Sequence, residues 1–335
     1  MEIKDTVIAS VQVTAEEIEL IRNRILETGE GISREEAERL AAGAPTDLLA
    51  DAADAIARKF NGTTVDSCSI VNARSGMCGE DCKWCAQSRH YATNCETYNF
   101  IDEEETMRAA RMNEKEGIRR FSLVTSGRAV SKKDMENFCR IFKRLSEETD
   151  LYLCASMGLI DREGMEMLKE AGVKRYHCNM ETSAKCFKEL CSTHTPEDKK
   201  KTIRAAREAG LEVCSGGIIG MGETMADRLD FAFELSELDI VSVPINILNP
   251  IPGTPLEKTP LISEEEVIRT VALFRLIMPK KAIRSAGGRM RLSEKSMLRI
   301  MTGGLNGVLM GDMLTTVSNS IADDRKLFAE AGLDF

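Results

Sequence analysis

The sequence predicts an α/β fold, a (β/α)8 TIM-type barrel with an N-terminal helical extension. The first observation behind this prediction is that short apolar runs alternate with amphipathic helical segments, as parallel βα units do. The second is that eight such runs follow the N-terminal region, and eight strands separated by helices favour a closed barrel over an open sheet. The expected strands are residues 67–73, 120–126, 152–158, 175–181, 212–220, 242–248, 282–287 and 307–311.

The region before the first expected strand reads as helices, from residue 14 to residue 60. Its first helix should end at Gly29, because glycine readily adopts the left-handed conformation that closes a helix. Ser33 and Glu36 have the spacing of a capping box at the start of the next helix. We therefore divide the chain into an N-terminal helical extension (1–62), a barrel (63–320) and a C-terminal tail (321–335).

Composition and charge are typical of a soluble globular protein. Of the 335 residues, 43% are hydrophobic and 30% are charged, which supplies enough apolar material for a large core. No run approaches the ~18 uninterrupted apolar residues of a membrane span, and the N-terminus lacks the apolar core of a signal peptide. A net charge of −9 argues against nucleic acid or an anionic membrane as a partner. These features predict a cytoplasmic protein.

Three of the eleven cysteines, Cys78, Cys82 and Cys85, form a C-x3-C-x2-C triplet directly after the first expected strand. Three thiolates at this spacing can hold a [4Fe–4S] cluster by three of its irons, which leaves the fourth iron open for a reacting ligand. Active sites of barrel enzymes lie at the carboxyl ends of the strands, so the triplet is in a suitable place. From the spacing alone, a Cys3His zinc site that includes His90 stays an alternative.

Six segments of the chain together resemble the biotin synthase family of radical S-adenosylmethionine (SAM) enzymes, across about residues 65–316. They are MCGEDCKWCAQS (77–88), YHCNMETS (176–183), VCSGGIIGMGE (213–223), PINILNPIPGTPL (244–256), IRSAGGR (283–289) and GDMLTT (311–316). The resemblance implies that SAM binds the open iron of the [4Fe–4S] cluster and yields a 5′-deoxyadenosyl radical. It also implies that the enzyme uses this radical to insert sulfur into dethiobiotin.

The same resemblance assigns roles to residues around SAM. Trp84 would lie beside the adenine, between two of the cluster cysteines. Asn179 and Glu181 would bridge the SAM ribose and the substrate, although the family pattern has an aspartate at the position of Glu181. The residues implied along the adenosine, all in the glycine-rich segment, are Gly216, Ile218, Gly220 and Glu223.

Substrate and protein partners also follow from the resemblance. Asn246 matches the residue that hydrogen-bonds the ureido ring of dethiobiotin, and an amide supplies both the donor and the acceptor that a cyclic urea needs. Together with Asn179 and Arg284, it forms the set of residues implied in catalysis. The family further suggests a small-protein electron donor of the flavodoxin or ferredoxin type, and a homodimer.

The second metal site departs from the family pattern. Members of the family hold a [2Fe–2S] cluster deep in the barrel on three cysteines and one arginine, and its sulfide is the proposed source of the inserted sulfur. Cys154, Cys214 and Arg284 match three of these positions, but Ser122 stands where the remaining cysteine is expected. Serine is a poor ligand for a soft metal, so the usual cluster cannot form with its usual ligands.

Cys68 is the replacement ligand that we predict. Inward side chains from alternate strands of a barrel share a layer, and Cys68, Cys154 and Cys214 lie on the first, third and fifth expected strands. We therefore expect an auxiliary iron–sulfur cluster on these three thiols, [2Fe–2S] or larger, with Arg284 beside it or ligating it. A rival set of ligands lies on the fourth strand and the loop after it, namely Cys178, Cys186 and Cys191.

Other functions stay open at this point. Another radical SAM enzyme with a similar barrel, such as a hydrogenase-maturation protein or a methylornithine synthase, would share the triplet. Arg284 with Cys154 and Cys214 favours a biotin synthase over these enzymes. An iron–sulfur electron carrier or a zinc-stabilised binding protein would belong to a different class. The glycine-rich segment and the enzyme-sized barrel argue against both of them.

Overall fold

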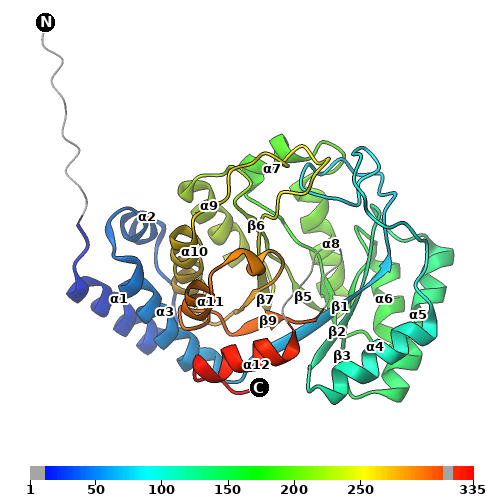
Figure 1. Cartoon of the computed structure of the whole chain (residues 1–335), viewed down its shortest axis with the longest axis horizontal. Helices are drawn as coiled ribbons and strands as arrows, with labels where there is room; N and C mark the ends of the chain where they lie inside the picture. Colours follow the sequence, from blue (N-terminus) through cyan, green and yellow to red (C-terminus); the bar gives the residue numbers. More distant parts are fainter. Residues whose placement is uncertain (1–11, 312–319) are drawn as a thin grey trace, which may run out of the picture.

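The computed structural model describes residues 12–311 and 320–335, and its centre is a closed barrel of parallel strands surrounded by helices (Figure 1). The strands follow the order β5-β4-β3-β2-β1-β9-β8-β7-β6, and a pairing between β5 and β7 closes the barrel. Because β5 and β6 are two halves of one expected strand, the predicted eight-stranded barrel is confirmed. The bounds are β1 (Asp66–Arg74), β2 (Arg120–Thr125), β3 (Tyr152–Ser156), β4 (Arg175–His177), β5 (Glu212–Cys214), β6 (Gly217–Ile219), β7 (Ser242–Ile247), β8 (Ala282–Ser285) and β9 (Gly307–Leu309).

The fifth strand of the barrel is interrupted between Cys214 and Gly217, where the sequence predicts a continuous strand. Pro244 of the neighbouring β7 explains the break, because proline lacks the N–H that the parallel ladder needs at this point. The two backbones also approach closely, since a Cβ atom on Gly216 would lie 2.0 Å from the Pro244 carbonyl oxygen. Residue 216 must therefore be glycine for the wall to close.

The fourth strand is shorter than predicted, because β4 ends at His177 instead of residue 181. Beyond β4 the chain leaves the ladder, and Glu181 lies in the left-handed region with φ 74° before it pairs with Gly217 in an isolated bridge. Gly217 has no room for a side chain, since a Cβ atom would lie 2.1 Å from the Glu181 carbonyl oxygen. This contact fixes the segment after β4 against β6.

Helices surround the barrel, and their ends follow the capping signals in the sequence. Gly29 closes α1 with φ 68°, and Ser33 and Glu36 form the predicted capping box of α2. The segment expected as a C-terminal tail contains a helix, α12, whose Asp324 is fully buried. The helices are α1 (Ala15–Thr28), α2 (Arg34–Gly43), α3 (Thr46–Asn61), α4 (Glu103–Lys115), α5 (Lys132–Glu148), α6 (Arg162–Glu170), α7 (Ala184–Leu190), α8 (Pro196–Glu208), α9 (Met225–Ser236), α10 (Glu264–Ile277), α11 (Glu294–Met301) and α12 (Ile321–Glu330).

Helices α1 to α3 form a layer on one flank of the barrel, where α3 packs against α10 (Figure 1). The buried face of α3 includes Leu49, Ala53 and Ile56, which follow the spacing of an amphipathic helix. Residues 270–277 of α10 are all buried, so the C-terminal half of this helix is enclosed on every side. Within the described ranges, no helix is long and apolar enough to cross a membrane.

Candidate active site

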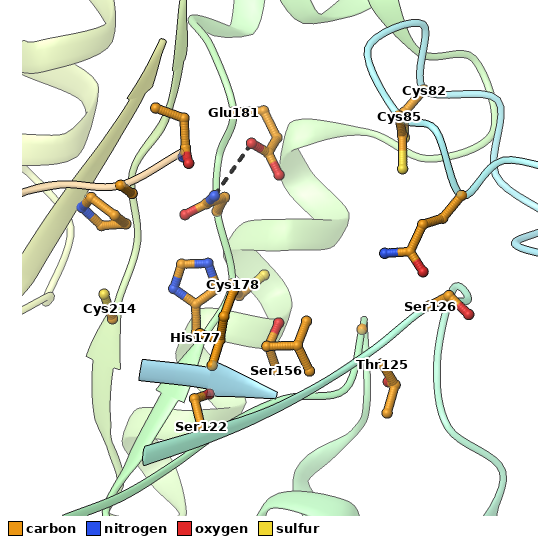
Figure 2. A pocket seen from close by; sticks show the side chains of 18 of the residues that line it. Cys82, Cys85, Ser122, Thr125, Ser126, Ser156, His177, Cys178, Glu181 and Cys214 are labelled. Carbon is orange, nitrogen blue, oxygen red and sulfur yellow. Dashed lines mark hydrogen bonds between the residues drawn. The ribbon is translucent and has the colours of Figure 1, made fainter. Parts of the chain in front are cut away.

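One cavity, of about 360 Å³, brings together the two sites that the sequence predicts (Figure 2). Its walls come from the barrel strands and from the loop that follows β1. Figure 2 shows Cys82 and Cys85 on this loop and Ser122 and Cys214 on the strands. The predicted site residues that line the cavity are Cys68, Cys78, Cys82, Trp84, Cys85, Cys154, Asn179, Glu181, Cys214, Asn246 and Arg284.

The cysteine triplet is carried by a tightly turned loop. Met77, directly before the first cysteine, has φ 51°, a left-handed conformation that is uncommon for a residue with a side chain. The N–H of Cys78 donates to the Gln87 carbonyl at 2.9 Å, and the N–H of Cys85 donates to the Cys82 carbonyl at 3.0 Å. These bonds fold the loop back on itself, and all three cysteines reach the cavity.

The chemistry of the triplet suits an iron–sulfur cluster. In the absence of metal, burial raises the pKa of the Cys85 thiol to about 12, and a hydrogen bond to Cys191 together with burial raises the pKa of Cys82. A bound cluster would take these soft ligands as thiolates and release their protons. His90, the fourth ligand of the zinc alternative, instead contacts the Gly79 carbonyl oxygen through Nε2 at 2.9 Å. A cluster held by these three thiols, with its fourth iron free, stays a prediction.

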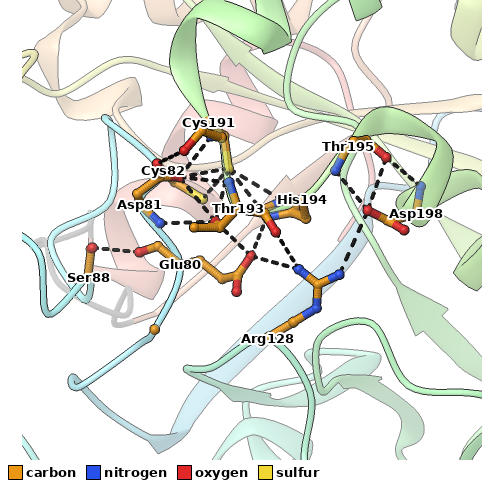
Figure 3. Close-up of polar contacts among 12 residues, drawn as sticks. Glu80, Asp81, Cys82, Ser88, Arg128, Cys191, Thr193, His194, Thr195 and Asp198 are labelled. Carbon is orange, nitrogen blue, oxygen red and sulfur yellow. Dashed lines mark hydrogen bonds and ion pairs between the residues drawn. The ribbon is translucent and has the colours of Figure 1, made fainter.

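A polar cluster that the sequence analysis missed lies against Cys82 (Figure 3). The sulfur of Cys191 lies 3.7 Å from the sulfur of Cys82 and 3.3 Å from Nδ1 of His194. The same ring atom of His194 lies 2.5 Å from a carboxylate oxygen of Glu80. Among the residues that the structure describes, Cys82, Cys191 and His194 are close enough together to share one metal ion. From the sequence, Cys191 is a rival ligand, but His194 and Glu80 were missed, because the C-x2-H spacing of Cys191 and His194 carries little weight alone.

Two polar residues implied for SAM are linked to the broken fifth strand. Asn179 accepts a hydrogen bond from the N–H of Gly216 at 3.0 Å, and its amide donates to Glu181 at 3.3 Å. Both side chains line the cavity. The hydrogen bond from Gly216 orients the Asn179 amide. The fold therefore fixes the direction of the second N–H group on its Nδ2 atom.

Asn246 is held by backbone contacts on both sides of its amide. Its Nδ2 donates to the Gly217 carbonyl at 3.0 Å, and its Oδ1 accepts from the N–H of Gly287 at 2.8 Å. A side-chain amide has two N–H groups and two acceptor lone pairs. Among the described residues, one donor and one acceptor of this amide therefore have no partner and are available to a ligand in the cavity.

The residues implied along the adenosine form the strand and turn beside the cavity and are not among its lining residues. They are Gly216, Ile218, Gly220 and Glu223. The carboxylate of Glu223 accepts hydrogen bonds from the N–H groups of Gly220 and Met221, each at 2.7 Å, and pairs with Arg228 at 2.7 Å. Glu223 thus stabilises the turn after β6, and a direct contact with SAM stays a prediction.

The three thiols predicted for the second cluster are buried and line the same cavity. Cys68, Cys154 and Cys214 lie on β1, β3 and β5, which are alternate strands of the barrel. Burial raises the pKa of Cys68 and of Cys154. Burial also opposes ionisation of Cys214, but a hydrogen bond from His177 and the charges of nearby arginines outweigh it, and the pKa of Cys214 falls to about 6. This set of soft donors fits an iron–sulfur cluster.

Ser122 lines the cavity as well, so a hydroxyl stands among the buried thiols. Of the rival cysteines, Cys178 lines the cavity, whereas Cys186 and Cys191 do not. Arg284 is buried and donates to Asp66 at 2.5 Å and to the Ser242 hydroxyl at 3.0 Å. Its guanidinium therefore has a fixed orientation.

A network of charges at the amino ends of the strands was also missed from the sequence. Asp66 pairs with Arg120 at 2.6 Å and with Arg284 at 2.5 Å, and it lies 3.9 Å from Arg175. Arg175 pairs with Glu212 at 2.6 Å. Burial opposes ionisation of Asp66, but the guanidinium groups around it keep its pKa below the ordinary value. Charged residues at strand ends are normally exposed, which is why this network could not be predicted from the sequence.

Two family models together match most of the chain. The model described as the radical SAM superfamily matches residues 74–235, and the model described as the biotin and thiamin synthesis associated domain matches residues 244–334. The first match ends in α9 and the second begins within β7, so the boundary between them falls inside the barrel.

Curated relatives and solved structures resemble the chain over nearly its whole length. A biotin synthase of Porphyromonas gingivalis is 50% identical over 94% of this chain and 95% of its own length. A biotin synthase of Acetivibrio thermocellus is 48% identical over 94% of this chain and 98% of its own length. A crystal structure of methylornithine synthase aligns with a TM-score of 0.75 at 19% identity, over 96% of this chain and 94% of that one. A crystal structure of a maturase of the [FeFe]-hydrogenase aligns with a TM-score of 0.78 at 16% identity, over 96% of this chain and 75% of that one. These two structural likenesses show the fold alone.

Proposed function

The chain belongs to the biotin synthase family of radical SAM enzymes, and from this membership we propose that it converts dethiobiotin to biotin inside the cavity of its barrel. The alternatives among radical SAM enzymes share only the fold, at 19% identity or less. The single observation that carries the proposal is that one cavity is lined both by the open cysteine triplet and by a second set of buried thiols. Sulfur insertion needs a source of radicals and a source of sulfur within reach of one substrate.

The triplet would hold the radical-generating cofactor. Cys78, Cys82 and Cys85 would hold a [4Fe–4S] cluster, which together with SAM would supply the radical chemistry that activates C–H bonds of the substrate. The protein's task is to position the reactants and to exclude groups that would quench a radical. Asn246 offers a free donor and a free acceptor to the ureido ring. Asn179 and Glu181 would position the ribose of SAM against the substrate.

The second set of thiols would hold the sulfur source. We propose an auxiliary iron–sulfur cluster on Cys68, Cys154 and Cys214, with Arg284 beside it or ligating it. The burial of all three thiols and their mutual electrostatic interactions support this ligand set. The hydroxyl of Ser122 is too hard a donor to replace the thiolate that the family pattern has there.

Three further features of the proposal rest on the family resemblance. A small flavodoxin or ferredoxin would deliver electrons to the first cluster. The enzyme would act in the cytoplasm and assemble as a homodimer. The negative net charge of −9 agrees with a partner that is neither nucleic acid nor an anionic membrane.

The test is an anaerobic reaction of the purified chain with SAM, a strong reductant and dethiobiotin. Mass spectrometry should detect both 5′-deoxyadenosine and biotin. Cys68→Ala should still release 5′-deoxyadenosine but should form at least about tenfold less biotin, because a buried thiolate ligand is lost. It should also contain less iron than the unmodified protein.

Ser122→Ala is the matched control, because it removes a polar group from the same cavity without removing a thiol. It should keep both the iron content and biotin formation. Equal iron and equal biotin in Cys68→Ala would contradict the ligand set. 5′-Deoxyadenosine without any biotin from the unmodified protein would contradict the substrate.

A further inference from the structure

Arg175 is a buried cation in the wall of the cavity that the catalytic scheme above does not use. It is the first residue of β4, where it pairs with Cys154 on β3 and with Glu212 on β5. The residue is only 6% exposed, and it lines the same cavity as the three thiols of the second site. A charge in this position needs partners, because burying an unpaired guanidinium is strongly unfavourable.

The guanidinium of Arg175 is only partly satisfied by the protein. Its Nε and Nη2 donate to one carboxylate oxygen of Glu212, at 3.0 Å and 2.6 Å. Its Nη1 is buried and has no hydrogen-bond acceptor among the described residues. A carboxylate oxygen of Asp66 lies 3.9 Å from Nη1, which is beyond hydrogen-bond distance. Glu212 fixes the plane of the guanidinium, and the N–H groups of Nη1 are available to hydrogen-bond a ligand.

The charges around Arg175 favour an anion. Asp66 is already bound by Arg120 at 2.6 Å and by Arg284 at 2.5 Å. Three guanidinium groups therefore face two carboxylates, on Asp66 and Glu212, and one positive charge remains for the thiolates and sulfide of the second site to balance. An anion that accepts from Nη1 would balance this charge and satisfy the buried N–H groups.

The neighbours of Arg175 indicate which anion this is. Arg175 interacts electrostatically with the thiols of Cys154 and Cys214, so the position lies among the soft donors of the second site. We infer that Arg175 binds a sulfide, either as a sulfide of the auxiliary cluster or as hydrosulfide. This sulfide is the sulfur that is inserted into dethiobiotin, or the sulfur that refills the cluster after turnover. This inference rests on the proposed function, because it requires the auxiliary cluster. It assigns Arg175 a role in holding the sulfur, while the thiols hold the iron.

The test measures labelled sulfide directly, with the full chain carrying both clusters under anaerobic conditions. The protein is incubated with ³⁴S-labelled sodium sulfide and desalted, and iron, acid-labile sulfide and retained label are then determined. Arg175→Gln should retain about tenfold less label at unchanged iron, the effect of losing one charge-assisted hydrogen bond. Arg175→Lys should retain an intermediate amount, because it keeps the charge but not the planar fork.

Arg120→Gln is the matched control. It removes a positive charge from the same network, but Arg120 does not line the cavity. The control should keep the label, and 5′-deoxyadenosine release by each variant shows that the barrel is folded and its first cluster is in place. Full retention of label by Arg175→Gln overturns the inference.

One other anion could meet Nη1, the carboxylate of dethiobiotin. In that case Arg175→Gln would raise the KM for dethiobiotin and leave the label unchanged, which also overturns the inference. If the unmodified protein contained only enough iron for the first cluster, the proposed function itself would be overturned. The iron measurement distinguishes this failure from the others.

Discussion

Cys68 and Ser122 lie on neighbouring strands and differ from the family pattern in opposite ways. In the β1–β2 ladder, Cys68 is opposite Arg120 and Ile70 is opposite Ser122. Both side chains line the cavity. Compared with the family pattern, β2 lacks a thiol at Ser122, and the neighbouring β1 has one at Cys68. With Cys154 and Cys214, Cys68 thus completes the three buried thiols that we propose for the second site.

Asn246 is the residue at which substrate binding can be tested separately from radical formation. Replacing Asn246 by alanine removes the donor and the acceptor that the backbone leaves free for the ureido ring. We expect the KM for dethiobiotin to rise by about tenfold to a hundredfold, the effect of losing one or two buried hydrogen bonds. SAM cleavage in the absence of dethiobiotin should change little. Steady-state kinetics with biotin detection measures both effects.

Asn249→Ala is the control for this change, because Asn249 is an exposed amide just beyond the same strand. Its KM for dethiobiotin should equal that of the unmodified enzyme. If Asn246→Ala also keeps an unchanged KM, Asn246 does not bind the ureido ring.

At the scale of elements, the contact between the segment after β4 and the strand β6 organises the mouth of the cavity. Glu181 and Gly217 form a bridge there, and the Gly217 carbonyl accepts from Asn246. Three residues implied in binding, Asn179, Glu181 and Asn246, are therefore all attached to the short strand β6 or to the break before it. The geometry of the site depends on how closely these two backbones approach.

Gly217→Ala tests this close approach. A Cβ atom at this position would lie 2.1 Å from the Glu181 carbonyl oxygen, which is rigid backbone. The chain must move to relieve the clash, and we expect a loss of about 3 kcal/mol in the free energy of unfolding. Urea denaturation followed by circular dichroism measures it.

Gly164→Ala provides the comparison within α6. Its new Cβ atom would meet only side-chain atoms, the nearest at 3.3 Å, and alanine favours a helix more than glycine does. This variant should be as stable as the unmodified protein or more stable. Equal stabilities of Gly217→Ala and Gly164→Ala would show that the contact at Gly217 is not rigid.

The strands were predictable from the sequence because each one is a short apolar run with its own local signal. The observed bounds of β1, β2 and β7 differ from the expected ones by one residue at each end at most. The break after Cys214 was not predictable, since Pro244, which causes it, lies on another strand. Helix α12 was missed because its sequence is mostly polar and buries little beyond Asp324 and Phe328.

The same distinction applies to the candidate site. The triplet was evident because its three cysteines are close in the sequence. The neighbours of Cys82, which are Cys191 and His194, are far from it in the sequence and meet it only in space. Arg175 was missed for another reason, since a charged residue at the start of a strand gives no sign of being buried.

At the scale of the whole molecule, the C-terminal helix joins the barrel to the N-terminal helices. Asp324 of α12 accepts two hydrogen bonds from Arg289 of the loop after β8, at 2.6 Å and 2.7 Å, and both residues are buried. Arg58 of α3 donates to the carbonyl of Ala331 at 2.8 Å. The backbone of Asp334 then bonds to the segment before β1. The C-terminal end of the chain is thus held against α3 and against the segment that leads into the barrel.

Asp324→Ala should weaken this connection strongly. It leaves the buried charge of Arg289 without its carboxylate, and we expect a loss of about 3–5 kcal/mol in the free energy of unfolding. Asp323→Ala, one residue earlier and exposed, should lose about 1 kcal/mol or less, because it contributes only to the cap of α12. Urea denaturation of both variants measures the difference, and equal losses would contradict a dominant role for the buried pair.

The order of the two metal sites along β1 has a consequence for how the enzyme matures. Cys68 is near the start of β1, and the triplet follows the end of this strand, so the second site lies deeper in the barrel than the first and at the other end of the same cavity. Iron or sulfide that enters past the triplet must travel inward to reach the thiols on the strands. A cluster on the triplet would narrow that path without closing it. Sulfide should therefore reach the inner thiols fastest before the first cluster is assembled, and between turnovers it should arrive once the products have left.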